Sequence, residues 1–118
     1  MREPFQAFVY NFDRDLPDYT PETQFGAFHS GEIVYAYDNL HTLERPWDEV
    51  DHGIAGNMTD YWVNFARNGD PNGPGLHSWY PYTIDQEAVM VIDTVTGQSA
   101  LPDRATLNFW LDYYNSLR

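Results

Sequence analysis

The segment Phe5–Phe12 places the strongest constraint on how this chain can fold. It reads Phe-Gln-Ala-Phe-Val-Tyr-Asn-Phe, is rich in aromatic and β-branched residues, and ends at turn-forming residues 13–17. Because the consecutive residues Phe8, Val9 and Tyr10 are all apolar, both faces of this strand are expected to be buried, as in a parallel sheet. Such a strand needs a neighbouring strand on either side and cover above and below it.

The rest of the chain offers little to meet that need. One further strand is predicted at Ala88–Asp93, and residues 79–82 are expected to be extended. An unpaired strand edge invites aggregation, so the pattern indicates a piece of a larger α/β sheet. We therefore expect residues 1–118 to form part of a domain, not a complete independent one, and to self-associate through the exposed strand.

Two longer helices are predicted from apolar periodicity. The first spans Asp48–Asn68, with Asp48 as its N-cap and Asn68-Gly69 closing its C-terminus. The second begins at Pro102 and Asp103 and continues to about Leu117. The expected apolar faces consist of residues three or four apart: Ile54, Met58, Trp62 and Phe65 in the first helix, and Leu107, Trp110, Tyr114 and Leu117 in the second.

Composition excludes several classes of protein. A chain of 118 residues suits one compact domain, and 42% hydrophobic residues exclude a disordered chain. The net charge of −12 disfavours nucleic acid and anionic membranes as partners. There is no cysteine, which excludes disulfides and thiolate chemistry. No apolar run approaches the roughly 20 residues of a membrane helix, and the first residues lack the apolar core of a signal peptide, so the compartment stays open.

A single histidine, His29, lies between Gly26 and Gly31, ahead of a short helix predicted at Glu32–Asp38. Glycine allows backbone conformations closed to other residues, which suits a sharp functional loop. A histidine with an ordinary pKa of roughly 6.5 can transfer protons near neutral pH. From this local pattern alone, a structural and a catalytic histidine both remain open.

Four segments of the chain match a known family pattern in order. They are Phe5–Asp13, Gly26–Tyr35, Tyr61–Gly73 and Trp79–Tyr82, and the most specific pieces are His-x-x-Glu and Trp-x-x-Phe-Ala-x-x-Gly-Asp-Pro-Asn-Gly. Together they resemble the C-terminal part of the type-B carboxylesterases, the α/β-hydrolase family that also contains the para-nitrobenzyl esterases and the cholinesterases. The resemblance runs over essentially the whole chain.

This resemblance implies an α/β fold, the C-terminal part of an α/β-hydrolase, with Phe5–Phe12 as the last strand of the central sheet. It implies that His29 is the triad histidine, which takes the proton from a serine as that serine attacks the ester carbonyl and returns it to the leaving alcohol. Glu32 resembles a buried polar residue that supports the site without direct chemistry. Trp62 and Phe65 resemble core residues.

The remaining parts of such a site have no counterpart in the sequence. In α/β-hydrolases the nucleophile and the acid precede the histidine, yet the 28 residues before His29 contain no Gly-x-Ser-x-Gly segment. Gly97–Leu101 begins like that segment, but it lacks the closing glycine and follows the histidine. No His-Gly-Gly-Gly-type oxyanion segment exists either. An ester substrate is therefore expected only once an N-terminal part completes the site, and the chain alone is expected to be inactive.

No cofactor or metal site is predicted. The four histidines lack zinc-ligand spacing: His29, His41, His52 and His77. Asp70–Gly73 faintly resembles a calcium loop, but Pro81 stands where a glutamate is needed, so a plain helix-ending turn is predicted. Two other functions remain open: a non-catalytic cholinesterase-like binding module and an independently folded acidic domain. Retention of His29 in its glycine-flanked loop favours the esterase over the binding module.

Overall fold

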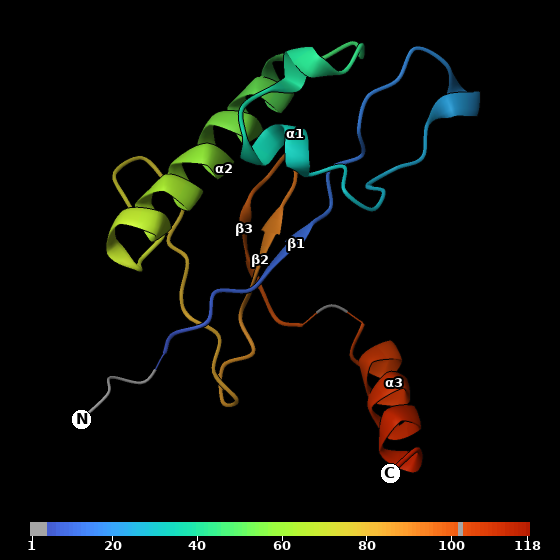
Figure 1. The fold of residues 1–118 in the computed structure, drawn as a ribbon, viewed down its shortest axis with the longest axis vertical. Helices are drawn as coiled ribbons and strands as arrows, with labels where there is room; N and C mark the ends of the chain where they lie inside the picture. Colours follow the sequence, from blue (N-terminus) through green and yellow to red (C-terminus); the bar gives the residue numbers. More distant parts are fainter. Residues whose placement is uncertain (1–4, 102) are drawn as a thin grey trace.

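The computed structural model describes residues 5–101 and 103–118, which form an α/β arrangement. The elements follow one another as β1 (Tyr10–Phe12), η1 (Pro21–Thr23), α1 (Ile33–Ala36), η2 (Leu40–Thr42), α2 (Glu49–Asn68), β2 (Val89–Ile92), β3 (Gly97–Ser99) and α3 (Arg104–Ser116). Figure 1 shows the short α1 beside the long α2, close to the strands, whereas α3 stands apart near the C-terminus. None of these helices in the described ranges is long and apolar enough to cross a membrane.

The three strands form one sheet in the order β1-β2-β3. β1 pairs with β2 in parallel, with Tyr10 opposite Met90, and β2 pairs with β3 in the antiparallel sense, with Met90 opposite Gln98. β2 is the most buried strand, because it has a neighbour on both sides. The predicted strand at Ala88–Asp93 is thus confirmed, and it is the centre of this sheet.

The predicted strand at Phe5–Phe12 is confirmed as a parallel strand but differs in length and burial. β1 comprises only Tyr10–Phe12, Tyr10 is 37% exposed, and Phe5 is 92% exposed. The expectation of burial on both faces is wrong, because no residue of β1 is fully buried; the strand is also one edge of the described sheet. It is also not the last strand, since β2 and β3 follow it in the chain. β3 was not predicted.

Helix α2 matches its prediction closely at both ends. Asp48 and Asp51 form a reciprocal capping box, and Gly69 closes the helix in the left-handed conformation with a φ of 71°. The buried face differs from the expected one, consisting of Asp51, Ile54, Ala55, Met58 and Tyr61. Of the two predicted core residues, Trp62 is partly buried and packs against the core cluster, whereas the prediction is wrong for Phe65, which is 48% exposed.

The core lies between β1, β2 and the pair α1 and α2. Residues two apart on a strand share a face, and Tyr10 and Phe12 both point towards the helices. The Tyr10 ring lies 5.1 Å from that of Trp62, and the Phe12 ring lies 5.0 Å from that of Tyr35. The buried cluster consists of Leu16, Val34, Tyr35, Ala36, Leu40, Ile54, Ala55, Met58, Tyr61, Trp79, Met90 and Ile92.

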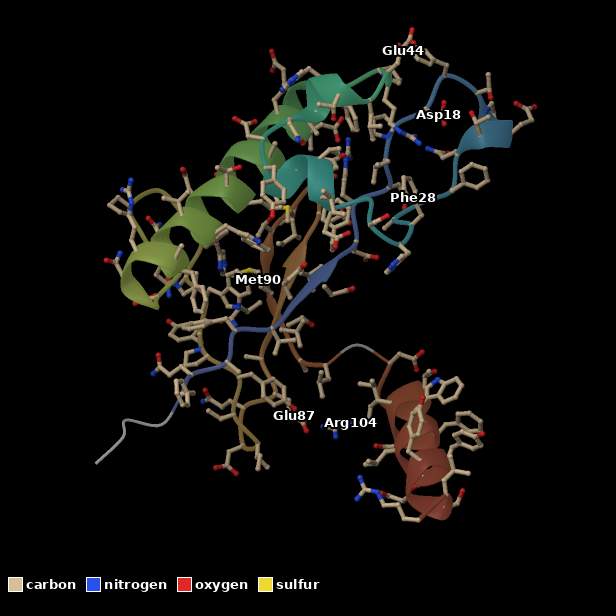
Figure 2. All side chains as sticks on the ribbon, viewed as in Figure 1. Asp18, Phe28, Glu44, Glu87, Met90 and Arg104 are labelled. Atoms are coloured by element: carbon tan, nitrogen blue, oxygen red, sulfur yellow. The ribbon has the colours of Figure 1, made fainter. Side chains whose placement is uncertain are left out.

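The predicted C-terminal helix is confirmed from its cap at Asp103, while Pro102 lies outside the described residues; α3 buries none of its residues. Asp103 caps it by accepting a hydrogen bond from the Thr106 amide at 3.2 Å. An ion pair between Arg104 and Glu87 links its first turn to the segment before β2 (Figure 2). The predicted apolar face is exposed at every position: Leu107, Trp110, Tyr114 and Leu117.

Candidate functional site

The loop that carries His29 is folded tightly between β1 and α1. The Gly31 amide donates to the Phe28 carbonyl at 2.9 Å, and Gly26 has a φ of 66°, which favours glycine. A Cβ atom at Gly31 would lie 2.9 Å from Cδ1 of Leu16 and 3.0 Å from the Phe28 carbonyl oxygen, so a larger residue would crowd the backbone of the loop. Both glycines predicted to shape this loop therefore have a structural reason to be there.

The His29 side chain is exposed at the tip of this loop. Within the described ranges its imidazole makes no hydrogen bond, whereas its backbone carbonyl accepts one from Oγ of Ser30. Ser30 itself has a φ of 68°, an uncommon conformation for a residue with a side chain. The structure thus places His29 in the expected loop, with its ring nitrogens accessible to other groups.

Glu32 lies at the N-terminus of α1 and is half-buried. Its carbonyl accepts a hydrogen bond from the Ala36 amide at 2.9 Å. Burial raises the pKa of the Tyr10 hydroxyl, and the negative charge of the Glu32 carboxylate raises it further. Among the described residues, no hydrogen bond or ion pair joins Glu32 to His29, so a supporting role for Glu32 stays a prediction.

Arg45 fastens the His29 loop to the segment that precedes it. Its guanidinium lies 5.4 Å from the centre of the Phe28 ring, a cation–π distance. The same group donates to the Pro17 carbonyl at 3.0 Å and to Asp18 at 3.3 Å. Figure 2 shows Asp18 and Phe28 on neighbouring loops at the same end of the molecule.

A hydrogen-bonded cluster around the buried carboxylate of Asp51 joins the segments on either side of this loop and was not predicted. Oδ1 of Asp51 accepts hydrogen bonds from Nε of Arg14 at 2.9 Å and from the Tyr35 hydroxyl at 2.8 Å, while Oδ2 accepts one from the Asp48 amide at 3.1 Å. The Asp51 side chain is fully buried. The Asp-x-x-Asp spacing at the start of α2 was the available signal, because it is typical of a reciprocal cap.

These contacts determine the protonation states in the cluster. Burial alone would raise the pKa of the Asp51 carboxyl, but hydrogen bonds from Arg14, the Asp48 amide and Tyr35 lower it below its ordinary value. Burial, followed by the hydrogen bond to Asp51, raises the pKa of Tyr35. Asp51 is therefore ionised and Tyr35 neutral near pH 7, so that Arg14 and Asp51 form a buried ion pair.

Two segments were compared with functional motifs in the sequence: Gly97–Leu101 with a nucleophile segment, and Asp70–Gly73 with a calcium loop. Gly97–Ser99 forms β3, not a strand–turn–helix elbow, and the Gln98 side chain bonds to the amide and carbonyl of Tyr80 at 3.0 and 3.2 Å. In the Asp70–Gly73 turn, the Asp70 carboxylate accepts from the amide and the side chain of Asn72 at 2.9 and 2.8 Å. These bonds hold the segment after α2 in a bend, and that it binds no calcium stays a prediction.

An open apolar groove of about 340 Å³ lies beside β1 and α2. Its lining is mostly aromatic and consists of Gln6, Ala7, Phe8, Tyr10, Tyr61, Trp62, Phe65, Pro71 and Trp79. Nε1 of Trp79 is buried and has no hydrogen-bond partner among the described residues. Neither His29 nor Glu32 lines the groove. In the described part of the chain, no three histidines or carboxylates gather in a way that could hold a metal ion.

Comparison with known proteins gives consistent matches over most of the chain. The model of the Carboxylesterase family matches residues 2–110. Cocaine esterase of Oryctolagus cuniculus is 33% identical over 109 residues, which are 88% of this chain and 20% of that protein. Bile salt-activated lipase of Mus musculus is 29% identical over 110 residues, which are 88% of this chain and 18% of that protein.

A solved structure gives the same assignment from the fold. The carboxylesterase of Geobacillus stearothermophilus superposes with a TM-score of 0.70 at 27% identity, covering 89% of this chain and 22% of that one. The chain thus spans about a fifth of the length of the relatives it matches. The predicted fold class, part of an α/β-hydrolase, is confirmed. The matched family model and the superposed esterase fold agree, and this chain belongs to the carboxylesterase family.

Proposed function

We propose that this chain contributes the catalytic histidine, His29, to a serine hydrolase that cleaves carboxylic esters. The observation that carries the proposal is the position of His29: an exposed imidazole in a tight loop between β1 and α1, shaped by Gly26 and Gly31. In this role His29 accepts the proton of the serine hydroxyl during attack on the ester and then donates it to the leaving alcohol.

The serine, the triad acid and the oxyanion hole are proposed to come from a further part of the enzyme. Two observations support this. The chain spans about a fifth of the length of its relatives, and its nearest approach to a nucleophile motif, Gly97–Ser99, is a strand of the sheet. A lone histidine without nucleophile and oxyanion donors gives little rate enhancement.

The same proposal assigns a role to the apolar groove. β1 forms an edge of the described sheet, and the groove beside it exposes apolar surface of Tyr10, Trp62 and Phe65. The further part of the hydrolase would pair with this edge and cover the groove. When that part is missing, the uncovered edge favours self-association of the chain.

One alternative rests on the same groove. As a non-catalytic binding module, the chain would take up a partner through this aromatic surface and would have no need of His29. The two proposals differ in their dependence on the imidazole. Binding through the groove would be unaffected by His29→Ala and weakened by Trp62→Ala, whereas ester hydrolysis would require His29.

The test joins residues 1–118 to the N-terminal four fifths of the Geobacillus stearothermophilus carboxylesterase, in place of the part that they match. Hydrolysis of a short-chain nitrophenyl ester is followed for the fusion and for the chain alone. We expect turnover from the fusion, and from the chain alone no turnover above a His29→Ala control. Clear His29-dependent turnover by the chain alone would contradict the proposed incompleteness. A folded fusion without activity would contradict the proposed function.

A further inference from the structure

The inference concerns Asp51, a buried carboxylate to which the proposed chemistry assigns no role. It is fully buried, and its two oxygens accept three hydrogen bonds, from Arg14, Tyr35 and the Asp48 amide. Arg14 lies after β1, Tyr35 lies in α1, and Asp48 precedes α2. One carboxylate therefore joins three separate segments, and two of these are the segments between which the His29 loop is suspended.

The first of these segments enters the loop through Arg14. Besides its bond to Asp51, Arg14 donates from Nη1 to Oγ1 of Thr94 at 3.1 Å, so its position is fixed from two sides. Two residues later, the Leu16 amide donates to the Gly26 carbonyl at 3.2 Å. The buried Leu16 side chain also packs directly against Gly31. Arg14 thus fixes residues 14–16, the segment against which the His29 loop packs.

The second segment leaves the loop through α1. The Ile33 amide donates to the Ser30 carbonyl at 3.2 Å, so the start of α1 is bonded to the residue that follows His29. Two residues further, the buried Tyr35 hydroxyl donates to Asp51 at 2.8 Å. Because α1 has only four residues, its orientation depends on tertiary contacts: this bond, the bond from Oγ1 of Thr59 to the Ala36 carbonyl at 3.2 Å, and the burial of Val34 and Ala36.

Asp51 itself has little freedom to move. It is the third residue of a twenty-residue helix, and the capping box fixes both its backbone amide and its second carboxylate oxygen. We propose that Asp51 is a positioning residue for His29, because it anchors both stems of the His29 loop to the N-terminus of α2. The proposal rests on the proposed function only in that it takes the His29 imidazole to be the group that transfers protons. The anchoring is a property of the chain itself.

The test compares two tyrosines in the full-length chain. Tyr35→Phe removes the bond to Asp51. Tyr61→Phe is the matched control, because Tyr61 is equally buried and its hydroxyl donates one hydrogen bond, to the His77 carbonyl at 2.6 Å. Hydrogen–deuterium exchange is measured by mass spectrometry for residues 24–32 and for residues 54–66 of α2. We expect Tyr35→Phe to speed exchange of residues 24–32 by about tenfold relative to α2, the effect of losing one hydrogen bond, and Tyr61→Phe to leave this ratio unchanged.

A spectroscopic readout distinguishes positioning from general loosening. In the chain with ¹³C-labelled histidine, the imidazole signal of His29 is assigned from a His29→Gln variant. Tyr35→Phe should shift the His29 signal and not that of His77, whereas Tyr61→Phe should do the reverse. Arg14→Lys, which keeps the charge and loses the shape of the guanidinium, should likewise affect residues 24–32 more than α2.

Two results would overturn the proposal: equal exchange of residues 24–32 in the two tyrosine variants, or an acceleration in Tyr35→Phe that extends equally over α2. Neither readout depends on catalysis. An inactive esterase fusion would therefore defeat the proposed function and leave the anchoring intact. An active fusion together with equal exchange in the two tyrosine variants would defeat the anchoring and leave the proposed function intact.

Discussion

Helices α2 and α3 have similar sequence patterns and very different surroundings. Both carry apolar residues three or four apart, and both begin with a capping aspartate. α2 buries five residues against α1 and the sheet, while α3 buries none. Its aromatic residues contact one another instead, with Phe109 and Tyr113 at 5.3 and 5.9 Å from the Trp110 ring.

This difference shows what amphipathic periodicity can establish. The pattern predicts that a helix has an apolar face, and most of the stability of such a helix comes from whatever that face packs against. For α2 the partner belongs to the described chain. For α3 no such partner lies among the described residues. The two helices should therefore respond very differently to equivalent substitutions.

The largest difference is expected at the two helix-start aspartates. Asp51→Ala leaves Arg14 and the Tyr35 hydroxyl without their buried acceptor, and should lower the free energy of unfolding by about 3–5 kcal/mol. Asp103→Ala, at the exposed start of α3, should leave that free energy unchanged and only fray the first turn. Urea denaturation of both variants measures the difference. Equal losses would show that α3 is part of the cooperative core.

The next largest difference is expected on the two apolar faces. Met58 is 1% exposed, so Met58→Ala creates a cavity and should cost about 2–5 kcal/mol. Leu107 is 43% exposed in α3, and Leu107→Ala should change stability by no more than about 0.5 kcal/mol. The midpoints of thermal unfolding should follow the same order. A comparable loss from Leu107→Ala would mean that the apolar face of α3 is covered in solution.

Acid should remove the part of the stability that depends on Asp51. The folded chain holds the pKa of Asp51 below its ordinary value of 3.8, so the unfolded chain binds the proton more tightly. The stability that Asp51 supplies is therefore complete above about pH 4 and is lost as the pH falls towards the folded-state pKa. Unfolding is measured between pH 3 and 7. Asp51→Asn should lower stability at pH 7 and flatten the acid-induced loss, and a curve parallel to the wild type would argue against this.

The smallest effect is expected from helix propensity. A Cβ atom at Gly53 of α2 would meet nothing within 4 Å, so Gly53→Ala should stabilise the chain by about 0.5–1 kcal/mol. Ala105→Gly makes the opposite change in α3 and should reduce helix content without changing the unfolding free energy. Circular dichroism measures the helix content, and urea denaturation measures the unfolding free energy of both variants.

Local signals were sufficient to predict α2 with its caps, the strand at β2 and the glycine-flanked loop of His29. Each of these is specified by residues near one another in the sequence. The Asp51 cluster was missed because Arg14 and Tyr35 approach Asp51 only in the folded chain, 37 and 16 residues away in sequence. β3 was missed for a similar reason: Gly97–Ser99 has no strand pattern and is ordered by pairing with β2.

Burial was harder to predict than secondary structure. Phe5–Phe12 and the stripe through Trp62 and Phe65 were expected to be buried, because apolar residues there outnumber polar ones. In the structure Tyr10, Trp62 and Phe65 line an open groove and none of them is fully buried, whereas Phe12 packs against the core. Their apolar pattern predicts a surface that is buried against a partner. The sequence of this chain alone does not reveal whether that partner belongs to the chain or to another part of the enzyme.

The central claim is that His29 is the proton-transferring histidine of an ester hydrolase, and the most direct test is kcat/KM of the completed fusion. His29→Gln should lower kcat/KM for a nitrophenyl ester by about 10³-fold or more, mainly through kcat, because the serine loses its base. His77→Gln, at a histidine outside the loop, should leave it within about twofold of the starting fusion. A folded His29→Gln fusion that keeps its activity would contradict the account.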